Sequence, residues 1–115
     1  MPNEHWPSEL DALTAAPENH KLLFENDSVR VLDTVIHPGQ TTPLHTHCWP
    51  AAIYMLSWSD CVRRDENCLV IFDSRNSPPP QMGLAHWLPP LRPHTLENVG
   101  ATDIRFIVFE LKKQP

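Results

Sequence analysis

The sequence lacks the features of a membrane-bound, secreted or nucleic-acid-binding protein. Its 115 residues contain no apolar run long enough to cross a bilayer. The first residues, MPNEHWPSELD, have neither the basic start nor the apolar stretch of a signal peptide. Nine Lys and Arg residues stand against 14 Asp and Glu residues, and this net charge of −5 disfavours a nucleic-acid-binding surface. We therefore expect a cytoplasmic protein that has neither a nucleic acid nor a membrane as its partner.

Cysteine and glycine are also scarce, with three residues of each. Cys48, Cys61 and Cys68 form an odd set without a C-x-x-C pair, which favours reduced thiols. A disulfide between Cys61 and Cys68 would need a hairpin centred between Arg64 and Asp65, and we expect free thiols instead. At 41% hydrophobic and 20% charged residues, the composition is that of one globular domain.

Short β-rich segments separated by turn residues fill most of the chain. A helix is expected only near the start, where Ser8 resembles an N-cap before the acidic residues Glu9 and Asp11, and where Pro17 ends the pattern. Many short strands with regular turns are typical of a β-sandwich or a closed barrel. The expected strands are Lys21–Glu25, Val29–His37, Ala51–Trp58, Cys61–Arg64, Cys68–Asp73, Leu84–Leu88 and Ile104–Leu111.

Histidine is the residue type best placed for chemistry. His45 and His47 lie two residues apart on what should be an extended segment, so both side chains point to the same face. Two imidazoles on one face can bind one ion, because neutral imidazole is a common ligand of transition metals. A third ligand must come from another strand, and His94 is the natural candidate. By itself an H-x-H pair is a weak sign, since surface histidines are ordinary.

Around these histidines the chain resembles the cupin superfamily. The first cupin motif runs Gly, five residues, His, one residue, His, three or four residues, Glu, and the chain matches it at Gly39, His45 and His47. The second motif runs Gly, five residues, Pro, one residue, Gly, two residues, His, three residues, Asn, and is matched at Gly83, Pro89, His94 and Asn98. The resemblance implies an all-β double-stranded β-helix, a jelly-roll barrel of six to eight strands. It assigns residues 17–115 to this barrel and residues 1–16 to an N-terminal segment with a short helix.

Two departures from the cupin motifs bear on the site. The glutamate of the first motif should fall at Ala51 or Ala52, and Leu91 stands where the second motif has its last glycine. The resemblance therefore implies one divalent transition metal, such as Fe, Zn, Mn or Ni, without a carboxylate ligand. The implied ligands are His45, His47 and His94.

Other residues near the motifs have competing interpretations. His86 is a candidate for a fourth metal ligand, a hydrogen-bond partner of a ligand or a general base, or else a histidine of the barrel wall. Arg92 either binds an anionic substrate or lies at the surface. Trp49 and Trp87 either fill the barrel or line a pocket. No role is assigned to His5, His20 or His37.

The resemblance leaves the function open between three classes. The first is a metalloenzyme, dioxygenase-like or isomerase-like, that acts on a small anionic substrate. The others are a non-enzymatic metal-binding or small-ligand-binding module and a metal-free structural cupin. Without the glutamate, three neutral imidazoles leave the ion its formal charge of about +2, which favours an anionic ligand. We also expect a homodimer, because Trp6, Leu10 and Leu13 could pack on a partner as well as on the barrel.

Overall fold

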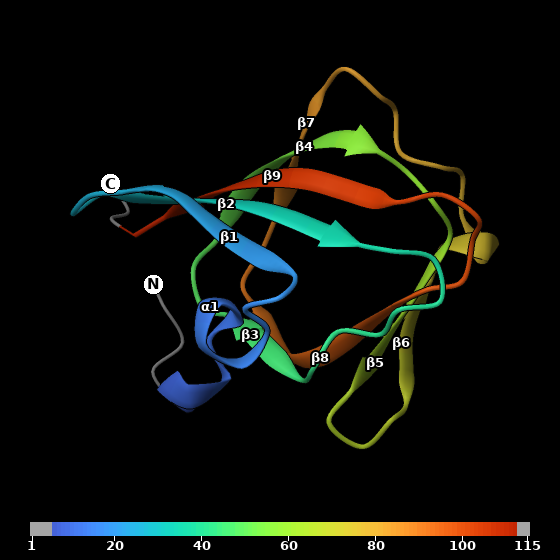
Figure 1. Ribbon diagram of the computed structural model, residues 1–115, viewed down its shortest axis with the longest axis horizontal. Coiled ribbons are helices and arrows are strands. Elements are labelled where there is room, and N and C mark those ends of the chain that lie inside the picture. Colours follow the sequence, from blue (N-terminus) through green and yellow to red (C-terminus); the bar gives the residue numbers. More distant parts are fainter. Residues whose placement is uncertain (1–5, 113–115) are drawn as a thin grey trace.

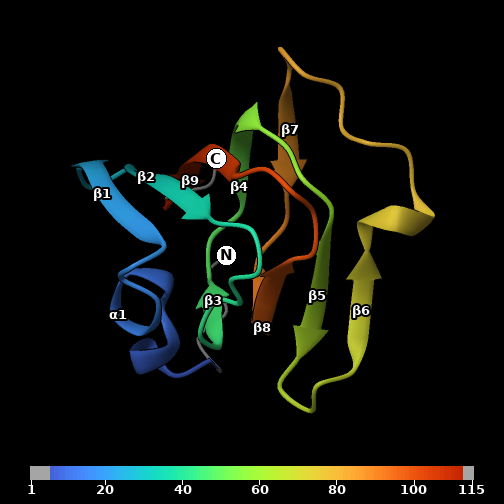
Figure 2. The ribbon, with the colours of Figure 1, turned by 45° about the vertical axis from the view of Figure 1, so that its right-hand side comes forward.

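The computed structural model describes residues 6–112, which form two antiparallel β-sheets packed face to face (Figure 1). The nine strands are β1 (His20–Glu25), β2 (Val29–Ile36), β3 (His45–His47), β4 (Ala51–Ser57), β5 (Cys61–Asp65), β6 (Val70–Asp73), β7 (Ala85–Leu88), β8 (Leu91–Asn98) and β9 (Ile104–Leu111). One sheet has the order β1-β2-β9-β4-β7 and the other β3-β8-β5-β6. Strands far apart in the sequence are thus neighbours, and the β5–β6 hairpin forms one edge of the barrel (Figure 2). The expected all-β architecture is confirmed.

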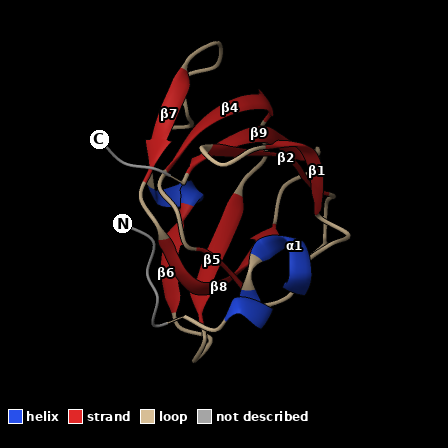
Figure 3. Ribbon diagram, turned by 90° about the vertical axis from the view of Figure 1, so that its left-hand side faces the viewer, coloured by secondary structure: helices blue, strands red, loops and turns tan. Residues whose placement is uncertain are grey.

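Three short helices accompany the strands. They are the 3-10 turns η1 (Ser8–Leu10) and η2 (Ser74–Asn76) and the helix α1 (Ala12–Ala15), which packs against β1 and β3 (Figure 3). The expected N-cap at Ser8 is wrong, because Asp11 caps α1 by accepting a hydrogen bond from the Leu13 amide at 3.2 Å. None of these helices within residues 6–112 is long and apolar enough to span a membrane.

All seven expected strands form, with ends that differ by at most two residues. The strands β3 and β8 lie outside the seven expected ones, although His45 and His47 were expected on an extended segment and His94 on another strand. The prolines at 89, 90 and 93 weaken the strand signal of β8. Pro93 falls where the pairing of β3 with β8 shifts register, between the pairs His45–His94 and His47–Leu91. The ladder therefore accommodates a residue that has no backbone N–H to donate.

The strand β2 shows how alternation sets the two faces of the sheet. Arg30, Leu32, Thr34 and Ile36 are buried, while the residues between them are half-buried. Leu32 and Ile36 belong to two separate apolar clusters of the core. Thr34 lies between them and lines a cavity in the barrel.

The motif residues Gly39 and Asn98 close the loops at one end of the barrel. Gly39 adopts a left-handed backbone with φ +81, which favours glycine, and its amide donates to the Asn98 carbonyl at 3.0 Å. The fully buried Asn98 side chain donates to the carbonyls of Ile36 and Thr102 and accepts from the Gly100 amide. These bonds tie the end of β8 to the end of β2 and to the loop before β9.

The three cysteines are free thiols. Cys61 is buried at the start of β5, whereas Cys68 is exposed in the turn between β5 and β6. The pairing of Val62 with Asp73 places Cys61 at the far end of the hairpin from that turn. The hairpin register thus separates the two residues that a disulfide would have to join.

Candidate metal centre

Four buried histidines from three strands face one another inside the barrel, each at most 5% exposed. A ring nitrogen of each of His20, His45 and His47 lies within 4.8 Å of the corresponding atoms of the other two. The ring centroid of His94 lies 4.4 Å from that of His45 and 5.8 Å from that of His47. The structure therefore groups His45 and His47 of the first motif with His20, while His94 packs against the rings of His45 and His47 outside that group.

Both sheets contribute to this histidine cluster. His45 and His94 are direct partners across β3 and β8, while His20 on β1 is opposite Thr34 of β2 in the other sheet. The ring centroid of His20 lies 4.9 Å from that of His45 and 5.3 Å from that of His47. Sequence analysis missed His20 because its place depends on how the two sheets face each other, and no local motif around it signals that arrangement.

The Nδ1 atom of each histidine in the cluster lies within hydrogen-bond distance of an oxygen atom. The acceptors, at 2.7–3.2 Å, are the Ala16 carbonyl for His20, the Pro43 carbonyl for His45, Glu110 Oε2 for His47 and the Arg92 carbonyl for His94. Carbonyl and carboxylate oxygens can only accept, so each Nδ1 must carry the ring proton. Each neutral ring then has an unprotonated Nε2, and this is the tautomer that a metal-binding imidazole needs.

Burial keeps these rings neutral. Desolvation is the main cause that lowers the imidazole pKa, to about 4 for His20 and His45, about 3 for His47 and about 2 for His94. The neighbouring rings and, except at His20, the charge on Arg63 lower these pKa values further. At neutral pH the cluster offers uncharged nitrogen donors, the protonation state that metal binding requires.

A fully buried carboxylate, Glu110 of β9, stands behind the cluster. Its Oε1 accepts from Arg30 Nε at 2.5 Å and its Oε2 accepts from His47 Nδ1 at 3.2 Å. Arg30 also binds both carboxylate oxygens of Asp11, at 2.8 and 2.9 Å. Burial raises the pKa of Glu110, and the charge on Arg30 opposes that shift. The network from Asp11 through Arg30 and Glu110 to His47 thus orients one ring of the cluster from the N-terminal helix.

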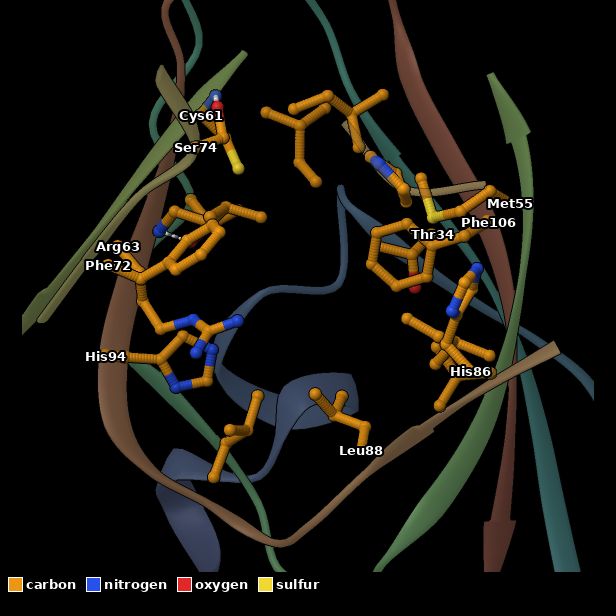
Figure 4. A pocket seen from close by; sticks show the side chains of 18 of the residues that line it. Thr34, Met55, Cys61, Arg63, Phe72, Ser74, His86, Leu88, His94 and Phe106 are labelled. Atoms are coloured by element: carbon orange, nitrogen blue, oxygen red, sulfur yellow. Dashed lines mark hydrogen bonds between the residues drawn. The ribbon is translucent and has the colours of Figure 1, made fainter. Parts of the chain in front are cut away.

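A cavity of about 310 Å³ lies between the sheets and includes the histidine cluster in its lining. Figure 4 shows Arg63, Phe72 and His94 on one wall and Thr34, Phe106 and His86 on the other. Most of the remaining lining is apolar. A small molecule in this cavity would meet the histidine nitrogens in largely apolar surroundings, where electrostatic interactions are stronger than in water.

The fold is similar to that of solved cupin structures. A cupin domain from Bordetella pertussis has a TM-score of 0.66 at 17% identity, covering 82% of this chain and 92% of that chain. An RmlC-like cupin from Methanocaldococcus jannaschii has a TM-score of 0.56 at 13% identity, covering 80% and 77%. The chain has the cupin fold. The polyketide cyclase RemF from Streptomyces resistomycificus is also similar, with a TM-score of 0.52 at 21% identity and coverage of 84% and 66%. No family model matches the sequence, and no curated protein matches it significantly.

The structure accounts for the two departures from the cupin motifs. Ala51 is 1% exposed and packs in the apolar core, while Ala52 lies on the opposite face of β4. Alanine has no side-chain atom that can bind a metal, so neither position supplies a ligand. The fourth polar group beside His45 and His47 is the imidazole of His20 instead of a carboxylate. Leu91 begins β8 and lines the cavity of this cupin barrel. The one non-glycine residue with positive φ within residues 6–112 is Cys68, so the lost glycine leaves no backbone strain at Leu91.

The two candidates for catalytic groups lie in different surroundings. His86 of β7 lines the cavity, opposite His94, and its Nε2 lies 3.0 Å from the Gln81 carbonyl. No ring contact joins it to the histidine cluster among the described residues. Arg92 is exposed and forms an ion pair with Glu66 at 2.6 Å. Of the two, His86 alone faces the cupin cavity.

The tryptophans near the motifs lie outside the cavity. The ring of Trp49 lies 5.0 Å from the Arg30 guanidinium, and Trp87 is 60% exposed on the outer face of β7. Trp58, which no motif singled out, lines the cavity instead.

Proposed function

We propose that this cupin-fold protein binds one divalent transition metal through His20, His45, His47 and His94 and acts on a small anionic molecule in the cavity. One observation carries the proposal, namely that all four Nδ1 atoms are committed to oxygen acceptors. The four Nε2 lone pairs then remain for an ion. An apolar barrel interior has no other evident use for four neutral imidazoles gathered at one place.

The donor set narrows the choice of metal. Imidazole suits Zn, Fe and Ni, whereas Mn prefers carboxylates and water, and no carboxylate belongs to the cluster of His20, His45 and His47. A bound ion of this kind supplies Lewis-acid or oxygen-activating chemistry at its remaining coordination positions. A dioxygenase-like or isomerase-like reaction is therefore the proposed activity.

The residues of the chain supply binding and orientation. Phe72, Leu96 and Phe106 give the substrate an apolar surface on which to pack. Glu110 holds the His47 ring in place through its Nδ1 atom. Neutral histidines leave the charge of an ion uncompensated by its own ligands, and this supports an anionic substrate.

A non-enzymatic metal-binding or small-ligand-binding module is the alternative. Among the described residues, His86 is the one histidine that lines the cavity outside the cluster. The lack of a second acid–base group beside it favours this alternative. Oxygen uptake and product formation over a panel of small carboxylic acids would distinguish the enzyme from the binding module.

Metal content tests the proposal directly. We expect about one zinc, iron or nickel per chain in protein purified without an affinity tag, measured by elemental analysis. His20→Ala and His94→Ala should each lower the affinity by more than the ~10–100-fold that loss of an outer-shell partner costs. His37→Ala is the control, because His37 is exposed and pairs with Asp103 away from the cluster. Metal content that is unchanged in both cluster variants would contradict the proposal, and a metal-free wild type would favour a structural cupin.

We also infer that the chain forms a homodimer. The outer face of the five-stranded sheet supports this inference, because large apolar patches are uncommon on monomers. Its exposed apolar residues are Phe24, Tyr54, Leu56, Trp87 and Phe109. The N-terminal segment instead packs on its own barrel, through Ala12 and Leu13. A cytoplasmic location remains a prediction from the sequence.

A further inference from the structure

One arginine of the barrel has no acidic partner. Arg63 is half-buried on β5, and no ion pair or hydrogen bond joins its side chain to another residue within residues 6–112. The five other arginines of the chain all form ion pairs with carboxylates. These arginines are Arg30, Arg64, Arg75, Arg92 and Arg105.

The surroundings of Arg63 make an unpaired charge costly. Its guanidinium lies 5.5 Å from the centre of the Phe72 ring, and it faces the cavity together with Leu96, its partner on β8. A guanidinium stays charged in proteins, and a charge in apolar surroundings is unfavourable unless an anion pairs with it.

Two acidic residues on β5 and β8, the strands of Arg63 and Leu96, are engaged elsewhere. The Asp65 carboxylate accepts from the amides of Asn67 and Leu69 and thereby holds the turn of the β5–β6 hairpin. Glu97 pairs with Arg64, which points to the other face of the sheet, at 2.8 Å. The protein therefore keeps a cation in the cavity without supplying the anion for it.

We infer that Arg63 is the receptor for a carboxylate of the molecule that occupies the cavity. The flat fork of a guanidinium matches the two oxygens of a carboxylate, so the pair can form two parallel hydrogen bonds. One carboxylate also balances the single charge of Arg63. In the metal-free protein, a phosphate dianion would bring a second negative charge into a largely apolar cavity, where the described lining offers no other arginine or lysine.

The position of Arg63 defines the class of ligand further. Arg63 and His94 lie on the same wall of the cavity (Figure 4). A ligand with its carboxylate at Arg63 can direct a second oxygen-bearing group to the histidine cluster while its apolar body packs on Phe72 and Phe106. This assignment rests on the proposed function in taking the cavity as a small-molecule site, but Arg63 needs no metal in order to bind a carboxylate.

Three probes of one shape test the assignment. We would measure binding of phenylacetate, phenylacetamide and benzylphosphonate by calorimetry to the full chain, both zinc-loaded and stripped with EDTA. The variants are Arg63→Met, which keeps the long stem without the charge, and Arg63→Lys, which keeps the charge without the fork. Arg64→Met is the matched control, since it removes the neighbouring charge from the other face of the same strand.

We expect the wild type to bind phenylacetate about 10–100-fold more tightly than phenylacetamide in both forms, as hydrogen bonds to charged groups imply. Arg63→Met should lose this preference in the EDTA-treated form, Arg63→Lys should retain only part of it, and Arg64→Met should keep it. Should Arg63→Met fail to fold, the reduced preference of Arg63→Lys carries the test.

The inference is overturned if the EDTA-treated wild type shows no preference or if Arg63→Lys binds phenylacetate as well as the wild type does. It is also overturned if folded Arg63→Met keeps the preference. Tighter binding of benzylphosphonate than of phenylacetate would assign the site to phosphate instead. Zinc binding by equilibrium dialysis separates this inference from the proposed function. A wild type that binds no zinc contradicts the metal site, whereas the carboxylate preference of the EDTA-treated protein still tests Arg63.

Discussion

At the scale of single residues, the hydroxyl of Thr34 is a polar group left unsatisfied in the barrel interior. It is buried opposite His20, lines the cavity and has no hydrogen-bond partner among the described residues. Leaving a buried polar group unsatisfied costs about 1–3 kcal/mol. We therefore expect the Thr34 hydroxyl to lower the free energy of unfolding.

Replacing the Thr34 hydroxyl tests this view. We expect Thr34→Val to leave the free energy of unfolding of the metal-free protein unchanged or to raise it by up to about 1 kcal/mol, because the variant removes an unsatisfied group. Thr42→Val is the matched control, since the buried Thr42 hydroxyl accepts from the Leu96 amide at 3.0 Å and its loss should cost about 1–3 kcal/mol. Urea denaturation measures both, and equal losses would show that Thr34 has a partner of its own within the protein.

The histidine cluster predicts how stability depends on pH. In the unfolded chain these imidazoles take up protons below pH ~6.5. In the folded protein the pKa is lowered to about 4 for His20 and His45 and further for His47 and His94. Between these values the unfolded state binds more protons, so stability falls as the pH falls from about 6.5 toward 4.

We therefore expect the melting temperature of the metal-free protein to drop by more than about 5 °C between pH 7 and pH 5. His94→Gln replaces one imidazole by a neutral amide and should make this drop smaller. The measurement is a series of thermal melts followed by circular dichroism. Identical drops in the wild type and the variant would show that other groups cause the pH dependence.

At the scale of elements, the network of Asp11, Arg30 and Glu110 joins three parts of the chain. Asp11 both caps α1 and binds Arg30 of β2, and Arg30 in turn binds Glu110 of β9. The side chains of Arg30 and Glu110 are 7% and 0% exposed. The network thus holds the N-terminal helix, through Asp11, against the sheet that contains His20.

Breaking this network should destabilise the fold and the site together. We expect Arg30→Met to lower the free energy of unfolding by about 3–5 kcal/mol, because it leaves the Glu110 carboxylate buried without its cation. Metal affinity should fall by ~10–100-fold as the orientation of His47 relaxes. Arg105→Met is the control, since Arg105 pairs with Asp33 at the surface and its loss should leave the free energy of unfolding nearly unchanged. Similar losses for the two variants, in urea denaturation, would argue against a special role for the buried network.

At the scale of the whole molecule, the exposed apolar face of the five-stranded sheet predicts assembly. We expect light scattering at micromolar concentration to give about twice the chain mass of 13.2 kDa. Trp87→Glu should return the mass to that of one chain, because it places a charge within the proposed interface, on its edge strand β7. Val70→Glu is the control, since Val70 is 56% exposed on β6 in the other sheet. A monomeric wild type, or a dimer that survives Trp87→Glu, would contradict this interface.

The sequence by itself determined seven of the nine strands and the motif residues. Alternating apolar residues predict strands because side chains alternate between faces, and the spacing of His45 and His47 places both rings on one face for the same reason. The separation of the two cupin motifs indicated His94 as their partner, and the structure pairs it with His45. These relations depend on residues close in the sequence or on a motif of fixed length.

Only the tertiary structure decided which other residues reach the site. His20, Glu110 and Arg63 lie on β1, β9 and β5, and none of them stands beside a motif. Their places follow from which strands pair and which face of each strand turns inward, and pairing between distant segments leaves no periodic signal in the sequence. A buried histidine, a buried glutamate and an unpaired arginine look like ordinary polar residues until the barrel closes around them.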